Sequence, residues 1–152
     1  MKLKSEDFEE NDFIPSRFTC DGENVSPQLY WEDVPEGARS FALSMTDPDA
    51  PGGTFIHWLV YNIPRGIRRI QRGGLPAGAR QVTNDFGSER YGGPCPPSGT
   101  HRYYFKLYAL DTDSLEEKIT RANFFEVVAR LFTSSPSLHR FHACFLISGE
   151  LS

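Results

Sequence analysis

The segment Tyr91-Gly-Gly-Pro-Cys-Pro-Pro-Ser-Gly-Thr-His-Arg-Tyr-Tyr104 is the most informative part of this chain. Its first half is too rich in glycine and proline for a helix or a central strand. Its second half opens a stretch, His101 to Leu110, that alternates as a β-strand does. The sequence therefore predicts a stiff loop that leads into a strand, with His101 and Tyr103 on one face near its start.

The loop before this strand has two interpretations. Proline carries no N–H, so the amides of the glycines, Cys95, Ser98 and Thr100 are its backbone donors. Exposed amides beside a histidine and a phenol are able to hold a small anion. Clusters of glycine and proline also form plain connections between strands. This segment alone leaves both interpretations open.

A similar loop precedes a second predicted strand. The strand Ser40 to Thr46 ends at Asp47-Pro-Asp-Ala-Pro51, and the chain continues as a strand from Thr54 to Ile63 that is apolar on both faces. Asp47 and Asp49 fit either turn formation or a functional site. His57, near the start of the second strand, fits either a hydrogen-bonded core histidine or a site residue.

Two predicted strands thus begin with a histidine after a loop rich in turn-forming residues. If the strands starting near His57 and His101 are parallel neighbours or meet at one end of a sheet, both loops converge. The shared pocket would then hold two imidazoles, two carboxylates and a phenol. This convergence is the geometric prediction on which a binding function depends.

The remaining chain predicts a β-rich protein with a small helical part. A capping-box pattern occurs twice, at Ser114–Glu117 and Asn123–Glu126, and a helical apolar stripe follows the second as far as Phe132, before Pro136. The segment from Pro64 to Ser88 is predicted to be a long loop. Further strands are predicted within Met1–Phe18, at Gln28–Asp33 and at Phe141–Ile147.

Composition limits the function classes. The chain has 152 residues, enough for one domain spanning residues 1–152, and its net charge of −4 gives no indication of nucleic-acid binding. The N-terminus is polar, and no apolar run is long enough to cross a membrane. The N-terminal acidic residues and the arginines between positions 65 and 72 are expected to be solvated.

Three cysteines at irregular spacing do not form a secreted disulfide framework. We expect a cytoplasmic protein with free thiols, while one Cys20–Cys95 bridge remains open because both cysteines fall in loops. His139 and His142 are three residues apart but have no third ligand nearby in the sequence, so no metal site is expected.

Three segments resemble the signature sequences of one family, in order and with similar spacing. They are Asp47-Pro-Asp-Ala-Pro51, Phe55-Ile-His-Trp-Leu-Val-Tyr-Asn62 and Gly93-Pro-Cys-Pro-Pro-Ser-Gly-Thr-His-Arg-Tyr103, and they resemble the phosphatidylethanolamine-binding proteins, also called Raf kinase inhibitor proteins. The segment Cys20–Pro27 is similar to the bacterial and archaeal branch. The resemblance implies a large, mainly antiparallel central sheet, a smaller sheet packed on it, and one or two peripheral helices.

The resemblance also implies an anion pocket at one end of the sheet. Carried over by motif position, its lining residues are Asp47, Asp49, His57, Tyr91, Gly93, Cys95, Pro96, His101 and Tyr103. Asp47 would repel a bare phosphate, so we expect it to orient an imidazole or to pair with a cationic group. Asp49 is expected either to line the pocket or to pair with Arg102.

The expected function is binding of a small phosphate-type anion or phospho-headgroup, without catalysis and without a cofactor. No Gly-x-Ser-x-Gly elbow, HExxH motif or P-loop is present, which leaves a hydrolase as a weaker alternative. The main alternative is a protein inhibitor or regulator that grips a serine protease or a kinase through its surface loops. A homodimer is a further expectation that the resemblance suggests.

Overall fold

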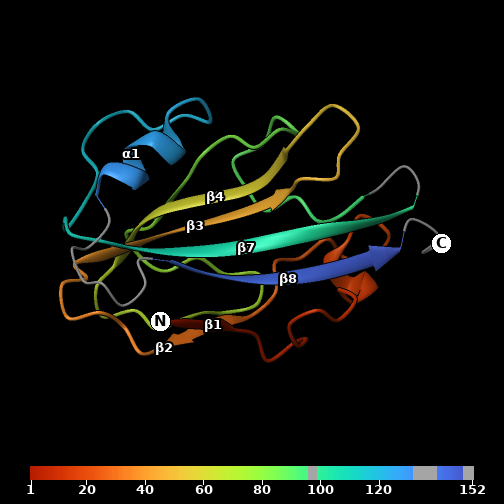
Figure 1. Ribbon diagram of the computed structural model, residues 1–152, viewed down its shortest axis with the longest axis horizontal. Helices are drawn as coiled ribbons and strands as arrows, with labels where there is room; N and C mark the ends of the chain where they lie inside the picture. Colours follow the sequence, from red (N-terminus) through yellow and green to blue (C-terminus); the bar gives the residue numbers. More distant parts are fainter. Residues whose placement is uncertain (96–98, 132–139, 149–152) are drawn as a thin grey trace.

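The fold was analysed in a computed structural model that describes residues 1–95 and 99–131, together with the backbone of residues 140–148. Two antiparallel sheets form the framework (Figure 1). The larger has the strand order β6-β4-β3-β7-β8, with bounds Arg80–Gln81, Phe55–Pro64, Ser40–Asp47, Thr100–Leu110 and Arg140–Ser148. The smaller has the order β1-β2-β5, with bounds Lys2–Lys4, Leu29–Glu32 and Arg69–Ile70.

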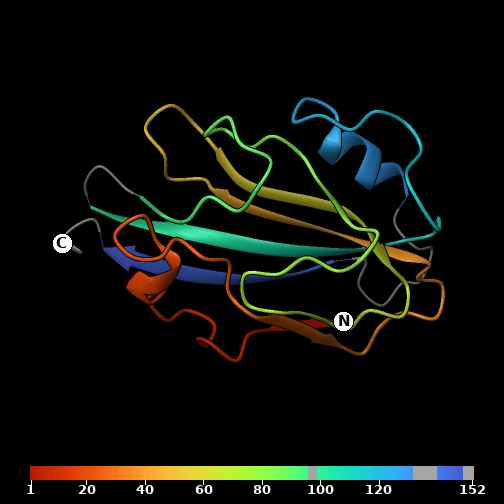
Figure 2. The same cartoon turned by 180° about the vertical axis from the view of Figure 1, so that it is seen from behind.

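The larger sheet is covered on both faces, as the apolar character of its central strands predicts. Trp31 of the smaller sheet packs in one cluster with Phe41 and Phe105 of the larger sheet. Helix α1 (Phe124–Arg130) contributes Phe124 to a second cluster, which includes Leu59 of β4. Figures 1 and 2 show α1 and the smaller sheet on opposite sides of the larger sheet. The expected β-rich architecture is therefore confirmed.

Two bulges interrupt β4, so its side chains do not alternate strictly between the two faces of the sheet. Asn62 has a positive φ of 56°, and the register shifts between the pairs Phe41↔Ile63 and Leu43↔Val60. The Asn62 side chain accepts a hydrogen bond from the Leu115 amide at 2.7 Å. An inserted residue reverses the alternation beyond it. Ile63 therefore joins the cluster of Val60 instead of facing the opposite way.

The helical prediction is correct only in its second half. Helix α1 begins after Asn123, whose side chain accepts a hydrogen bond from the Thr120 amide at 2.8 Å. The segment after Ser114 is irregular, which contradicts the first capping box. Asn62 binds the Leu115 backbone, and this tertiary contact competes with a first helical turn there. The predicted end of the stripe, at Phe132 and Pro136, lies outside the described residues.

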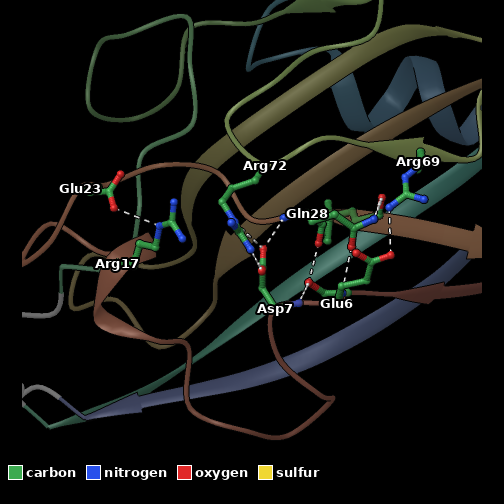
Figure 3. A network of polar contacts seen from close by, with 9 residues as sticks. Glu6, Asp7, Arg17, Glu23, Gln28, Arg69 and Arg72 are labelled. Atoms are coloured by element: carbon green, nitrogen blue, oxygen red, sulfur yellow. Dashed lines mark hydrogen bonds and ion pairs between the residues drawn. The ribbon is translucent and has the colours of Figure 1, made fainter.

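The N-terminal segment is fastened to the chain around β5 by a polar network (Figure 3). The Asp7 carboxylate accepts hydrogen bonds from the Arg72 side chain and from the Gln28 amide. Burial alone would raise the pKa of Asp7, but these two donors outweigh it and lower the pKa. Arg69 pairs with Glu6 at 2.9 Å. The expectation of solvated charges is therefore wrong for Asp7, whose side chain is 6% exposed, and holds for Glu6, Arg69 and Arg72, whose side chains are at least 41% exposed.

Within the described part of the chain, no helix has the length and apolar character needed to span a bilayer.

Candidate functional site

The candidate site lies at one end of the larger sheet, where the ends of three neighbouring strands meet. Strands β4 and β7 both run antiparallel to the central strand β3. The starts of β4 and β7 therefore flank the end of β3, at the right-hand side of the sheet in Figure 1. A cavity of about 180 Å³ lies at this end of the sheet. Its lining residues are Asp47, Ala50, Pro51, Phe55, His57, Phe86, Cys95, His101 and Tyr103.

The predicted convergence of His57 and His101 is thus present in the structure. His57 lies near the start of β4 and His101 near the start of β7, and both line the cavity. Asp47 ends the strand between them. The convergence follows from antiparallel pairing of both strands with β3, which makes β4 and β7 parallel to each other.

His57 is the extra residue of the second β-bulge. Met45 and Thr46 are adjacent in β3, but their partners in β4 are Trp58 and Ile56. A bulge re-aims a side chain and leaves its backbone groups outside the ladder. Here the His57 carbonyl accepts hydrogen bonds from the Gly92 amide and the Asn84 side chain, each at 3.1 Å. The bulge therefore joins β4 to the loop that precedes β7.

The His57 ring is held by the same loop. Its Nδ1–H donates to the Gly92 carbonyl at 2.7 Å, because a carbonyl oxygen can only accept. Burial lowers the pKa of His57, and it outweighs the hydrogen bond to Gly92 and the nearby Asp47 charge. The free protein therefore holds a neutral His57 at pH 7, with Nε2 as the ring nitrogen left for a ligand.

Asp47 orients the second imidazole, which is one of the two roles that the sequence predicts for it. Its Oδ2 accepts the Nδ1–H of His101 at 2.6 Å, and both side chains are buried. Its other oxygen accepts the Asp49 amide at 2.8 Å, so Asp47 is a turn former as well. This pair fixes the plane of the His101 ring and leaves its Nε2 for a ligand.

Tyr103 lines the cavity with a fully buried side chain. The residue is 0% exposed, and its hydroxyl is one of three buried side-chain polar atoms in the described residues without a hydrogen-bond partner. Burial raises the pKa of Tyr103, and the Asp47 and Asp49 charges raise it further. Tyr103 is therefore a neutral phenol. Its ring contacts both imidazoles, with its centroid 5.3 Å from that of His57 and 6.4 Å from that of His101.

Asp49 does not line the cavity, because Arg102 binds it. Its carboxylate accepts hydrogen bonds from Nε and Nη2 of Arg102, at 3.0 and 2.8 Å, and from the Arg102 amide at 2.8 Å. These hydrogen bonds lower the pKa of Asp49 to about 2. The structural alternative stated for Asp49 is the correct one. Its role is to tie the turn after β3 to the start of β7.

Tyr91 and Gly93 support the site from behind and are absent from the cavity lining. The Tyr91 hydroxyl donates to the Phe18 carbonyl at 2.7 Å, and burial raises the pKa of this phenol. The Gly93 amide donates to the Asn24 side chain at 2.7 Å. Of the predicted lining residues, Asp47, His57, Cys95, His101 and Tyr103 do line the cavity. Pro96 lies outside the described residues.

The expectations of free thiols and of a loop with free amides are wrong in part. Cys20 and Cys95 form a disulfide bond, with their Cα atoms 5.4 Å apart. The Gly92 and Gly93 amides are bound internally, to the His57 carbonyl and the Asn24 side chain. The loop is thus fastened to its neighbours at several points. Side chains, rather than these two amides, provide the polar groups of the cavity.

Four lining residues were missed in the sequence: Ala50, Pro51, Phe55 and Phe86. Three of them fall within or beside the quoted motifs, so motif position could have indicated them. Phe86 lies in the long predicted loop, far from these motifs. The one sequence feature that could have indicated Phe86 as a lining residue is the presence of an aromatic side chain within a turn-forming sequence, Asn84-Asp-Phe-Gly87.

No three histidine, cysteine, aspartate or glutamate side chains come together as a metal site in the part of the chain that the structure describes. His139 lies outside that part, and so does the side chain of His142.

Residues 4–136 match the family model of the phosphatidylethanolamine-binding proteins. The chain belongs to this family. A UPF0098 protein of Methanothermobacter thermautotrophicus is 51% identical over 117 residues, which cover 74% of this chain and 78% of that protein. The UPF0098 protein YbhB of Escherichia coli is 41% identical over 129 residues, covering 76% of this chain and 82% of YbhB.

Solved structures of this family agree with the fold. The phosphatidylethanolamine-binding protein homologue CT736 of Chlamydia trachomatis superposes with a TM-score of 0.85 at 34% identity, covering 96% of this chain and 95% of CT736. Escherichia coli YbcL, a member of the mammalian family of these proteins, superposes with a TM-score of 0.87 at 31% identity, covering 97% of this chain and 97% of YbcL. The family membership predicted from the motifs is therefore confirmed.

Proposed function

We propose that this member of the phosphatidylethanolamine-binding protein family binds a small phosphate-type anion in the cavity between His57 and His101. The observation that carries the proposal is the buried hydroxyl of Tyr103, which has no hydrogen-bond partner among the described residues and belongs to a ring in contact with both imidazoles. A buried polar group without a partner is costly, and an acceptor in the cavity would satisfy it. Phosphate oxygens are such acceptors.

The charges in the cavity decide which form of phosphate binds. The buried Asp47 carboxylate accepts the Nδ1–H of His101, and His57 is neutral in the free protein. No lysine or arginine is among the described lining residues. A dianion would be repelled unless a proton enters with it. We propose that Nε2 of His57 takes up this proton and then donates to the anion.

The sign of the pH dependence follows from this proton. An anion beside His57 favours the charged imidazole, so the pKa of His57 is higher in the complex than in the free protein. Affinity is then highest at low pH and falls as pH rises through the bound pKa, by at most about tenfold per pH unit for one proton. Expected affinity therefore decreases above neutral pH.

Calorimetry with inorganic phosphate between pH 5.5 and 8.5 tests this proposal. In two buffers with different ionisation enthalpies, binding at the alkaline end of this range, where free phosphate is mainly a dianion, should show net proton uptake, which His57→Gln should reduce. Sulfate, which remains a dianion over this range, serves as a control for general charge attraction. Equal proton linkage in the wild type and in His57→Gln would contradict the role of His57, and absence of phosphate binding would contradict the function.

We propose that the protein binds its phosphate-type ligand without catalysing a reaction on it. The Cys95 sulfur is in a disulfide bond and cannot act as a thiolate nucleophile while that bond is present. Phosphate-ester hydrolysis that His101→Ala abolishes would overturn this. Inhibition of a serine protease or kinase remains an alternative proposal. It predicts tight inhibition that persists in His101→Ala, since surface loops rather than the cavity would make the contacts.

The disulfide bond also bears on the proposed compartment. Cytoplasmic residence was inferred from free thiols, and a Cys20–Cys95 bond removes that reason because disulfides persist mainly in oxidising environments. Thiol labelling of protein taken directly from cells, before and after reduction, tests the proposal of a cytoplasmic location. Labelling of both cysteines without reduction would favour it.

A further inference from the structure

Two phenylalanines that the proposed anion site does not use form one wall of the cavity beside His57. Phe86 contacts Phe55 edge-on at a centroid distance of 4.8 Å and His57 at 5.3 Å, while Phe55 lies 5.0 Å from His57. Both phenylalanines line the cavity, next to Ala50 and Pro51. Phe86 is 49% exposed, so about half of its apolar surface faces solvent. The cavity thus has a polar side and an apolar side.

The turn that carries Phe86 is held rigidly. Asn84 is fully buried, and its side-chain oxygen accepts hydrogen bonds from the Phe86 amide at 2.9 Å and the Ser88 amide at 3.1 Å. Its side-chain nitrogen donates to the His57 carbonyl at 3.1 Å and to the Arg90 carbonyl at 2.7 Å. One buried side chain therefore fixes the Phe86 turn and the His57 bulge to each other.

The position of the Phe86 ring depends on the absence of a side chain at Gly92. A Cβ atom placed on Gly92 would lie 2.4 Å from Cδ2 and 2.6 Å from Cε2 of Phe86, so the ring packs directly against the backbone of this glycine. The same Gly92 carbonyl binds the His57 ring. Position 92 thus serves the polar and apolar sides of the cavity together, and a larger residue would displace the phenylalanine.

We propose that Phe86 is a specificity-determining residue of this cavity, and that the ligand is a phosphate monoester with an apolar substituent. The inference rests on the proposed function, since the phosphate group would occupy the polar side. A phosphate ester has its substituent within one bond of the phosphate oxygens. A substituent directed toward Phe86 would cover the exposed part of the ring and remove apolar surface from water.

The test compares phenyl phosphate with glycerol phosphate, two monoesters that differ in the polarity of the substituent. Calorimetry is carried out on the wild type, Phe86→Ala, Phe86→Leu and Phe13→Ala. Phe13 is a matched control because it is also an exposed phenylalanine, at 56%, but does not line the cavity. Inorganic phosphate is measured in parallel as the ligand without a substituent.

In the wild type, phenyl phosphate is expected to bind about tenfold more tightly than glycerol phosphate, a ratio that one aromatic contact provides. Phe86→Ala should reduce the ratio to about one, Phe86→Leu should keep part of it as an apolar contact does, and Phe13→Ala should keep all of it. An unchanged ratio in Phe86→Ala, with phosphate still bound, would overturn this inference alone. If none of the three compounds binds the wild type, the proposed function fails with it.

Discussion

Replacement of Tyr103 by phenylalanine removes one oxygen atom and separates ligand binding from fold stability. The Tyr103 hydroxyl is buried and has no hydrogen-bond partner among the described residues, so the substitution removes no hydrogen bond that the structure records. If an anion accepts from this hydroxyl, the complex loses one hydrogen bond to a charged group. The same substitution should therefore leave the fold intact and lower the affinity for the ligand.

The magnitudes follow from the two environments. A hydrogen bond to a charged group contributes about 1.5 to 3 kcal/mol, so phosphate affinity should fall by roughly 10- to 150-fold. Removal of an unsatisfied buried hydroxyl should raise the free energy of unfolding by up to about 1 kcal/mol. For a chain of this length, that change corresponds to an increase in Tm of about 2 to 4 °C.

Tyr108→Phe provides a matched control on the same strand. The Tyr108 hydroxyl is buried against the Ser44 hydroxyl at 3.2 Å, on the opposite face of the sheet from the cavity. This variant should lose about 1 kcal/mol of stability and bind phosphate as the wild type does.

Urea unfolding and phosphate calorimetry on both variants measure the two effects. The reasoning about Tyr103 would be refuted if Tyr103→Phe were destabilised as much as Tyr108→Phe. Unaltered phosphate affinity in Tyr103→Phe would refute it equally.

Three further predictions concern the frame of the site. Asn84→Ala should lower the free energy of unfolding, measured in urea, by about 3 kcal/mol, because the buried side chain makes four hydrogen bonds that the variant lacks. A loss below about 1 kcal/mol would contradict this. Reduction of Cys20–Cys95, which are 75 residues apart, should lower stability by about 4.5 kcal/mol, and an unchanged Tm with dithiothreitol would disagree. His57 has a lowered pKa in the folded protein, so unfolding binds a proton below pH 6.5 and stability should fall as pH decreases from there, with a smaller slope in His57→Gln.

Much of the sheet could be predicted because its strands repeat a simple pattern. The predicted strand Ser40–Thr46 matches β3 to within one residue, and His101–Leu110 matches β7 equally closely. Alternation of this kind directly reflects which side chains enter the two clusters. The convergence of His57 and His101 was predicted from two similar loop-to-strand junctions, and antiparallel pairing with β3 explains it.

The details of the site could not be predicted because they depend on contacts between distant segments. The bulge at His57 leaves a regular apolar pattern unchanged in the sequence, and only the pairing with β3 shows the extra residue. The role of Asn84 depends on the His57 carbonyl, 27 residues away. Likewise, the Asn62 side chain competes with a helical turn after Ser114 through a contact with a residue 53 positions away, which local propensity does not contain.

The most direct test of the site is a crystal structure of the protein soaked with inorganic phosphate. We predict one phosphate ion in the cavity, with its oxygens within hydrogen-bond distance of Nε2 of His57, Nε2 of His101 and the Tyr103 hydroxyl. A phosphate ion bound at another surface, while water alone fills the cavity at saturating phosphate, would contradict the central claim.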